Sequence, residues 1–88
     1  MLADNIVFVG KKPVMAYVTA CITCMTSHGG VVTVAARGNT ISRVVDVIEV
    51  LKRFIQYKVE NVEFGTDILE QDGGKRNIST IRVTISKL

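Results

Sequence analysis

Residues 5–36 read NIVFVGKKPVMAYVTACITCMTSHGGVVTVAA, and their pattern decides the fold. β-Branched and aromatic residues fill 5–9 and again 31–36, which is typical of buried strands. Between them apolar residues recur every three or four positions, which predicts a helix with Pro13 as its first residue and a stop at the glycine pair 29–30. A strand, a helix and a strand in this order predict two parallel strands joined by a right-handed crossover.

A second helix is predicted after a tight turn at 37–40, in which Asn39 or Thr40 caps the helix. The helix is expected to run to about Gln56. Its core-facing side chains are predicted to be Ile41, Val44, Val45, Ile48 and Leu51. A further apolar row of Val47, Val50 and Phe54 makes the apolar face wider than a core requires, which predicts a surface for a partner.

The rest of the chain predicts two strands joined by a turn. Apolar residues interleave with acids over 58–70, which predicts a strand with an irregularity at Gly65. Turn-forming residues occupy 71–77, and residues 80–86 alternate between polar and apolar, which predicts a strand with one buried face. The order βαβαββ predicts an α/β fold of the two-layer α+β kind, in which a four-stranded mixed sheet carries two helices on one face.

Length and composition predict a single domain over residues 1–88. Apolar residues make up 48% of the chain and charged residues 22%, as in an ordered globular protein. No apolar run approaches the roughly 20 uncharged residues of a membrane span, and no basic segment precedes the first apolar run as in a signal peptide. Two cysteines without a secretion signal fit a reducing compartment, so we expect a soluble intracellular protein without a membrane partner.

The net charge of +3 is distributed unevenly. Up to residue 44, Lys11, Lys12, Arg37 and Arg43 stand against Asp4 alone, whereas seven basic and seven acidic residues cancel from residue 45 onward. The lysine pair precedes the first helix and Arg37 precedes the second, where unpaired backbone N–H groups and the helix dipole favour phosphate. Because parallel strands end at the same edge of a sheet, these cations are predicted to converge on a polyanion.

Four motifs together resemble the archaeal Alba chromatin proteins of the Sac10b type. They are GKKPVM at 10–15, ARG at 36–38, ISRVVD at 41–46 and the segment 62–88, in the order and spacing of that family and over nearly the whole chain. The resemblance implies a homodimer whose extended hairpin arms follow the minor groove of double-stranded DNA while its body holds phosphates. It implies a chromatin protein that coats and condenses DNA, also binds RNA, and is found in the cytoplasm on the chromosome.

The resemblance also assigns roles to residues. Phosphate contacts fall on Lys11, Lys12, Arg37 and Arg43, arm-tip contacts on Lys75 and Arg76, and the contact between dimers on DNA falls on Phe54. Ala35 and Asn39 stand where many members have Lys or Arg, so Asn39 is a polar contact in a thinner, more salt-sensitive basic surface. Acetylation of Lys11 or Lys12 would remove a charge there, which makes a deacetylase or acetyltransferase a candidate partner.

Metal, redox and enzyme chemistry find less support. Cys21 and Cys24 lie late in the first helix, whereas redox pairs stand at helix N-termini, so both are predicted to be core residues. His28 is expected on the surface near the helix end, and with the cysteines it still lacks a fourth zinc ligand. Neither a nucleophile with its base nor a nucleotide-binding loop is found, so no enzyme and no cofactor are predicted.

Two other functions remain open. One is a dedicated RNA-binding protein, such as an RNA-processing subunit or RNA chaperone. The other is an oligomeric scaffold whose partner is a protein. The few aromatic residues lie in apolar patterns, which disfavours stacking on single-stranded bases and favours recognition of the nucleic-acid backbone.

Overall fold

Strands and helices follow one another in the predicted order. The structure, a computed structural model, describes residues 5–88. Its elements are β1 (Ile6–Phe8), α1 (Val14–Ser27), β2 (Val31–Arg37), the 3-10 turn η1 (Gly38–Thr40), α2 (Ile41–Leu51), β3 (Tyr57–Gln71) and β4 (Gly74–Lys87). The predicted α/β fold of order βαβαββ is confirmed.

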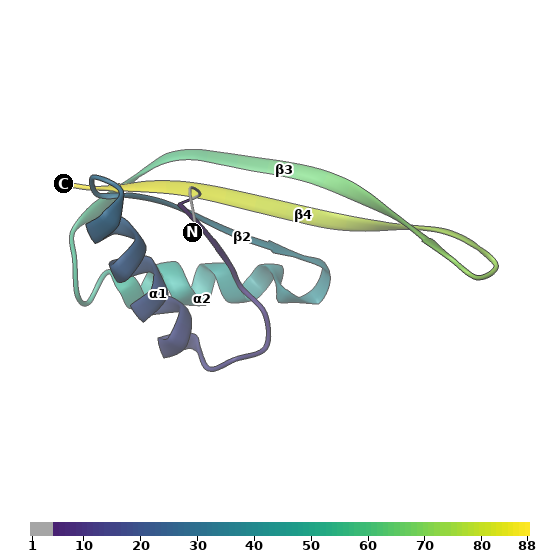
Figure 1. Cartoon of the computed structure of the whole chain (residues 1–88), viewed down its shortest axis with the longest axis horizontal. Coiled ribbons are helices and arrows are strands. Elements are labelled where there is room, and N and C mark those ends of the chain that lie inside the picture. The colour runs from purple at the N-terminus through teal and green to yellow at the C-terminus, as the bar shows by residue number, and fades with distance from the viewer. Residues whose placement is uncertain (1–4) are drawn as a thin grey trace.

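The four strands form one sheet in the order β1-β2-β4-β3. β1 runs parallel to β2, as the first 36 residues predict, and β4 pairs antiparallel with β2 on one side and β3 on the other. Both helices cover the same face of this sheet (Figure 1). The opposite face carries no helix.

Side chains from the helix-covered face form the core. In β2 and β4 they are every second residue, including Val32, Val34 and Ile85, so the alternation predicted for 80–86 is confirmed. The helices contribute Val18, Cys21, Val44, Val47 and Leu51, all fully buried. Each such side chain stabilises the fold by about 1.5–3 kcal/mol relative to an exposed position.

β3 and β4 continue beyond the sheet as a two-stranded arm. β2 pairs with β4 only over residues 80–86, whereas β3 pairs with β4 from 74 to 87. The molecule is therefore 47 Å long but 24 Å in its other two dimensions (Figure 1). The C-terminus lies at the end opposite the arm tip.

Two predictions about this hairpin were wrong. The turn is only Asp72–Gly73, because Gln71 already pairs with Gly74, and Gly73 adopts a positive φ of +91° that favours glycine. Lys75 and Arg76, at the expected turn tip, consequently belong to β4. The irregularity lies between Val59 and Asn61 rather than at Gly65, which stays in register with Thr80.

The helix boundaries also differ from the predictions. Pro13 lies before α1 rather than inside it, since its ψ of 145° is extended. Thr40 occupies the N-cap position of α2, but its side chain does not cap the helix; the hydroxyl instead donates to the Arg37 carbonyl at 2.8 Å, within the turn. α2 ends at Leu51, five residues before the predicted end. The chain must turn there to enter β3.

The two apolar rows of α2 differ from the predicted rows at Val45 and Val47. Val45, expected in the core, is 55% exposed, whereas Val47, expected in the outer row, is fully buried. The core face of α2 is therefore rotated from the predicted one and is centred on Val44, Val47 and Leu51.

This rotation predicts different costs for the same truncation at two positions. Val47→Ala should lower the free energy of unfolding by about 2 kcal/mol, because it leaves a cavity in the core. Val45→Ala should cost less than about 1 kcal/mol, because half of that side chain already contacts water. Urea unfolding followed by circular dichroism measures both. Equal costs would contradict the observed rotation of α2.

Candidate nucleic-acid interface

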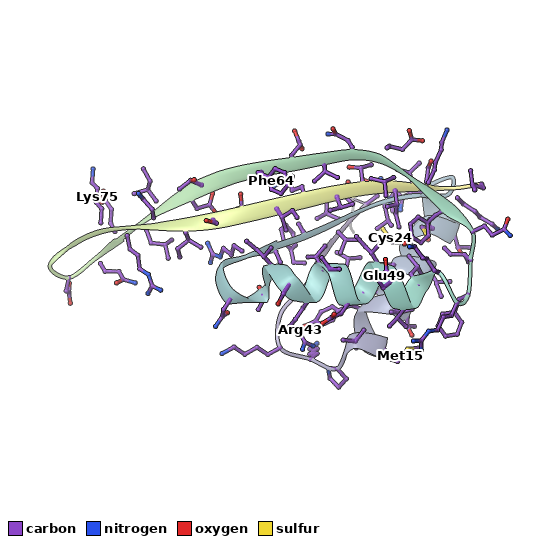
Figure 2. All side chains as sticks on the ribbon, turned by 180° about the vertical axis from the view of Figure 1, so that it is seen from behind. Met15, Cys24, Arg43, Glu49, Phe64 and Lys75 are labelled. Carbon is purple, nitrogen blue, oxygen red and sulfur yellow. The ribbon has the colours of Figure 1, made fainter. Side chains whose placement is uncertain are left out.

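The loop between β1 and α1 is held from two sides. Arg43, in the first turns of α2, donates from Nε to the Gly10 carbonyl at 2.8 Å and from Nη2 to the Lys12 carbonyl. The backbone N–H of Lys12 donates to the Tyr17 hydroxyl oxygen at 3.0 Å. These bonds fix the backbone that carries Lys11 and Lys12, and both lysine side chains are exposed. Figure 2 shows Arg43 beside this loop.

Arg43 therefore fixes the position of this loop in addition to contributing a positive charge. A guanidinium has five N–H donors in a planar fork, and here that fork reaches two carbonyls at once. A lysine ammonium is a point charge on a flexible stem and cannot reproduce this geometry. The donors of Arg43 that the loop does not use remain available to a phosphate.

The turn between β2 and α2 leaves the same end of the sheet as the lysine loop. Phe8 is in register with Ala35, and the Val9 N–H donates to the Ala35 carbonyl at 2.8 Å, so both strands end side by side. The predicted placement of the two turns at one sheet edge is thus confirmed. Arg37 and Asn39 are exposed in this turn, and Gly38 adopts a φ of +64° that favours glycine.

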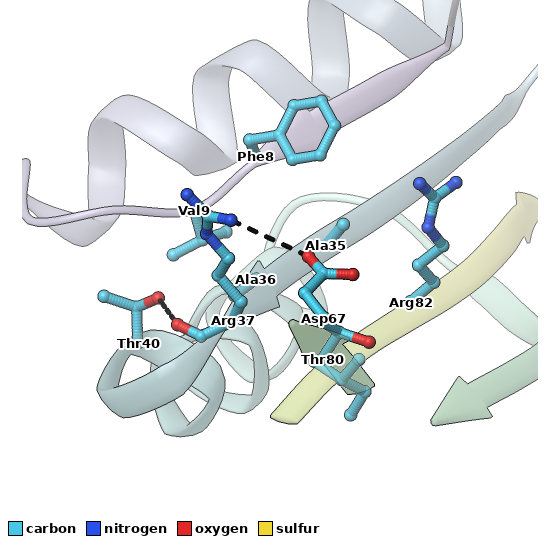
Figure 3. Close-up of a pocket in the computed structure, with 10 residues that line it drawn as sticks. Phe8, Val9, Ala35, Ala36, Arg37, Thr40, Asp67, Thr80 and Arg82 are labelled. Atoms are coloured by element: carbon cyan, nitrogen blue, oxygen red, sulfur yellow. Dashed lines mark hydrogen bonds and ion pairs between the residues drawn. The ribbon is translucent and has the colours of Figure 1, made fainter. Parts of the chain in front are cut away.

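Arg37 has a weak acidic partner on the arm. Its Nη1 lies 3.7 Å from Oδ2 of Asp67 in β3, and both side chains are exposed (Figure 3). Exposed ion pairs of this kind contribute about 0–1 kcal/mol and are screened by salt. A phosphate can therefore displace Asp67 from the Arg37 guanidinium at little cost.

The arm brings one of its two predicted cations to this turn. Arg76 lines a groove of about 450 Å³ together with Arg37 and Asn39. Lys75 is in register with Glu70 and, as the adjacent residue of a strand, points to the opposite face (Figure 2). The structure therefore joins Arg37, Asn39 and Arg76 and leaves Lys75 apart from them.

A further cation, which was not predicted, lies on the helix-free face of the sheet. Arg82, in β4, is in register with Ala35 of β2 and lines a second groove together with Arg37. The alternation of 80–86 already implied an outward position for Arg82. Ala35 itself is buried, so the position where many family members carry a cation is here the floor of the sheet face.

Phe54 lies on the surface at the other end of α2. It is 54% exposed in the turn after the helix, where its N–H donates to the Leu51 carbonyl at 3.0 Å. Next to it, Lys52 binds Glu49 at 2.9 Å, and this hydrogen bond raises the pKa of Lys52. The Tyr57 hydroxyl donates to the Ile48 carbonyl at 2.6 Å and fixes the path from this turn into β3.

The two cysteines remain thiols. Burial raises the pKa of Cys21 to about 12, and it also raises the pKa of Cys24. His28 Nδ1 lies 3.0 Å from the Cys24 carbonyl and 3.8 Å from its Sγ, at the end of α1. Cys21 is a core residue as predicted, whereas Cys24 is only partly buried. Within residues 5–88, no three His, Cys, Asp or Glu side chains group as metal ligands do.

No helix within residues 5–88 is long and apolar enough to cross a membrane.

Comparison with known proteins places this architecture in a family. Residues 5–66 match the Alba family model. The chain is 40% identical over 89 residues to the DNA/RNA-binding protein Alba of Thermoplasma acidophilum, with 99% of this chain and 100% of that protein covered. It is 48% identical over 88 residues to the DNA/RNA-binding protein Alba of Methanococcus maripaludis, with 96% of this chain and 99% of that protein covered.

Solved structures agree. Alba from Thermoplasma volcanium superposes with a TM-score of 0.84 at 39% identity, covering 94% of this chain and all of that one. ALBA1 from Trypanosoma brucei shares the fold, with a TM-score of 0.77 at 23% identity over 99% of this chain and 72% of that one. The chain belongs to the Alba family, whose members are nucleic-acid-binding architectural proteins rather than enzymes.

Proposed function

We propose that this protein coats and condenses double-stranded DNA without sequence preference, as a homodimeric chromatin protein, and that it also binds RNA. The observation that carries this proposal is the rigid basic end of the sheet. There Arg43 holds the Lys11–Lys12 loop, and Arg37, Asn39 and Arg76 share a groove. Lysine and arginine side chains grouped in this way fit phosphates, which every sequence presents alike.

The arm supplies the second contact of this proposal. It extends beyond the body for the length of a two-stranded ribbon and carries Arg76 on one face and Lys75 on the other. A ribbon of this shape fits the minor groove, where arginine and lysine follow the negative potential of the duplex. Arg76 then extends the row of Arg37 and Asn39 along one wall of the minor groove, while Lys75 contacts the opposite wall.

Modification and location follow from the same site. Lys11 and Lys12 are exposed on a fixed loop, so an acetyltransferase and a deacetylase could reach them and change the charge that faces DNA. A protein that coats DNA is retained on the chromosome, in the cytoplasm of a cell without a nucleus. The archaeal relatives are named DNA/RNA-binding proteins, which supports both polymers as ligands.

A salt titration tests the basic site. Arg37→Ala combined with Lys12→Ala should weaken binding to all sequences of mixed duplex DNA alike and lower the slope of log K against log salt by about two per bound subunit. Fluorescence polarisation with equal-length duplex DNA and duplex RNA measures the slopes and ranks the polymers. A dedicated RNA-binding protein would prefer RNA at equal salt.

The matched control is Lys58→Ala combined with Lys87→Ala. It removes the same charge from the end of the sheet far from the arm, where Lys58 and Lys87 lie near the C-terminus. Its slope of log K against log salt should differ from that of the intact protein by less than about one. If both double variants lower the slope equally, net charge rather than the proposed site determines binding. Salt-insensitive or absent binding would favour a protein scaffold.

The proposed role of Arg43 in positioning the loop has its own test. Arg43→Lys keeps the positive charge but cannot bridge the Gly10 and Lys12 carbonyls, so it should lose roughly as much duplex affinity as Arg43→Ala, about fivefold. Amide hydrogen exchange at residues 10–12 should rise in both variants. Binding by Arg43→Lys equal to that of the intact protein would reduce Arg43 to a simple charge.

The homodimer is proposed from an apolar strip that one chain leaves uncovered. Val59, Val62 and Phe64 of β3 are in register with Ile85, Val83 and Ile81, so they share the helix-covered face of the sheet. Their partners in β4 are buried, yet Phe64 is 80% exposed because neither α1 nor α2 covers this part of β3. A second copy that covers this strip would bury it, as homodimer interfaces do.

Phe64→Asp should therefore give a folded monomer, because a carboxylate in an apolar interface stays unpaired. Sedimentation equilibrium measures the mass, and circular dichroism verifies the fold. Phe54→Ala is the matched control: we propose that Phe54 joins dimer to dimer, so this variant should remain a dimer in solution and lose only cooperative binding along DNA. A dimeric Phe64→Asp variant would place the interface elsewhere.

A further inference from the structure

Phe8 is exposed on the helix-free face of the sheet. Its neighbours Val7 and Val9 point into the core, and the alternation of a strand turns Phe8 to the other side, where it is 67% exposed. Phe8 lies in an apolar run, the pattern from which the sequence predicted that aromatic residues disfavour base stacking, yet its ring is exposed to solvent. A single exposed aromatic residue is common on protein surfaces, so its surroundings decide whether it has a function.

Those surroundings form a row across the sheet. Phe8 is in register with Ala35, and Ala35 is in register with Arg82. Two strand spacings separate the ring from the arginine, roughly 10 Å between backbones. Ala35 between them is buried, and its short side chain forms the floor of the groove rather than a wall between the ring and the guanidinium. A flat group about 3.5 Å thick can enter between a ring on one side and a guanidinium on the other.

The same row lies in a groove of about 560 Å³. Its walls include Phe8, Arg37, Thr80, Arg82 and Asp67 (Figure 3). The volume is within the range of small-ligand sites, roughly 300–1,000 Å³. Two arginines against one aspartate make the groove net positive, and Asp67 is already engaged by Arg37. The ligand that fits is therefore flat, aromatic and anionic.

Arg82 is available for such a ligand. Within residues 5–88 its guanidinium has no carboxylate within 4.0 Å, and Glu63, its register partner in β3, forms no ion pair with it. Arginine also stacks its planar guanidinium on aromatic rings. It can thus cover one face of a base or bind the adjoining phosphate, while Phe8 covers the other face.

We infer that this groove binds an unpaired nucleotide of single-stranded DNA or RNA, with its base between Phe8 and Arg82 and its phosphate near Arg37. The inference deepens the proposed function and rests on it, since the same basic end of the sheet supplies Arg37. A base within a duplex is stacked on both faces and paired along one edge, so it cannot enter. The charge of the groove favours a nucleotide over a second copy of the chain or an apolar peptide.

Phe8→Trp provides a direct probe, because the chain contains no tryptophan. Its fluorescence should be quenched when a single-stranded oligonucleotide binds, and should change little with a duplex of equal length. An oligomer of the same length made of abasic sites keeps the phosphates and should bind without quenching. Leu88→Trp is the matched control, exposed at the far end of β4, and should respond to none of the three.

Phe8→Leu tests the affinity. The intact protein should bind the base-bearing strand about tenfold more tightly than the abasic strand, as expected for one stacked base. In Phe8→Leu this difference should disappear, while the salt slopes and duplex binding stay as in the intact protein. Circular dichroism verifies that the exposed position tolerates both substitutions.

The outcomes separate the inference from the proposed function. If all three polymers bind with steep salt slopes but Phe8→Trp is not quenched and Phe8→Leu changes nothing, the stacking site is wrong and the coating function stands. If no polymer binds even at low salt, both are wrong. A blue shift of Phe8→Trp emission that grows with protein concentration alone would instead assign the groove to a second copy of the chain.

Discussion

The basic end of this molecule depends on the bonds between Arg43 and the carbonyls of Gly10 and Lys12. A loop that carries adjacent lysines repels itself and would sample many conformations if it were free. Here one guanidinium neutralises two carbonyl dipoles and ties the loop to α2. Parallel pairing of β1 with β2 makes this possible, because it brings the start of α1 and the start of α2 to one edge.

The second constraint is that the sheet is wider than its helices. Two helices on one face can cover β1, β2 and β4, and β3 at the edge then keeps apolar side chains such as Phe64 in water. The length of β3 and β4 adds to this mismatch, since residues 74–79 of β4 pair with β3 but not with β2. One chain thus leaves an uncovered apolar strip, which a second copy would cover in the proposed dimer, and an arm, which would contact the duplex in the proposed complex.

The sequence predicted the order of elements because their periods are clear: alternation in 80–86 and three-to-four spacing in α1 each allow one interpretation. Predictions from the sequence were wrong where a few tertiary contacts determine the local structure. Residues 71–77 include the turn formers Asp72, Gly73, Gly74 and Asn77, yet only Asp72 and Gly73 turn, since the remaining ones can pair across the hairpin. In α2, Val45 and Val47 are equally apolar, and only packing selects Val47.

The candidate site likewise contains residues that the sequence predicts and residues that only the strand register brings together. A lysine pair before a helix and an arginine before the next are visible in the order of residues, so Lys11, Lys12 and Arg37 could be named. The row of Phe8, Ala35 and Arg82 could not, because it joins three strands distant in the chain and depends on their register. Phe8 within an apolar run resembles a core residue until the face of its strand is known.

The charges of the arm argue for one orientation on a polyanion. The C-terminal half is neutral in sum, but β3 carries Glu60, Glu63, Asp67 and Glu70 against Lys58 alone, whereas β4 carries Lys75, Arg76, Arg82 and Lys87. A hydrogen bond from Ser86 lowers the pKa of Glu60, so that carboxylate is ionised at neutral pH. Beyond the end of β2 the β4 edge is open, with Arg76 toward Arg37 and Asn39. In the proposed complex, phosphates are attracted to that edge and repelled by the acidic β3 edge, so the β4 edge of the arm faces the duplex, with Arg76 and Lys75 on its two faces.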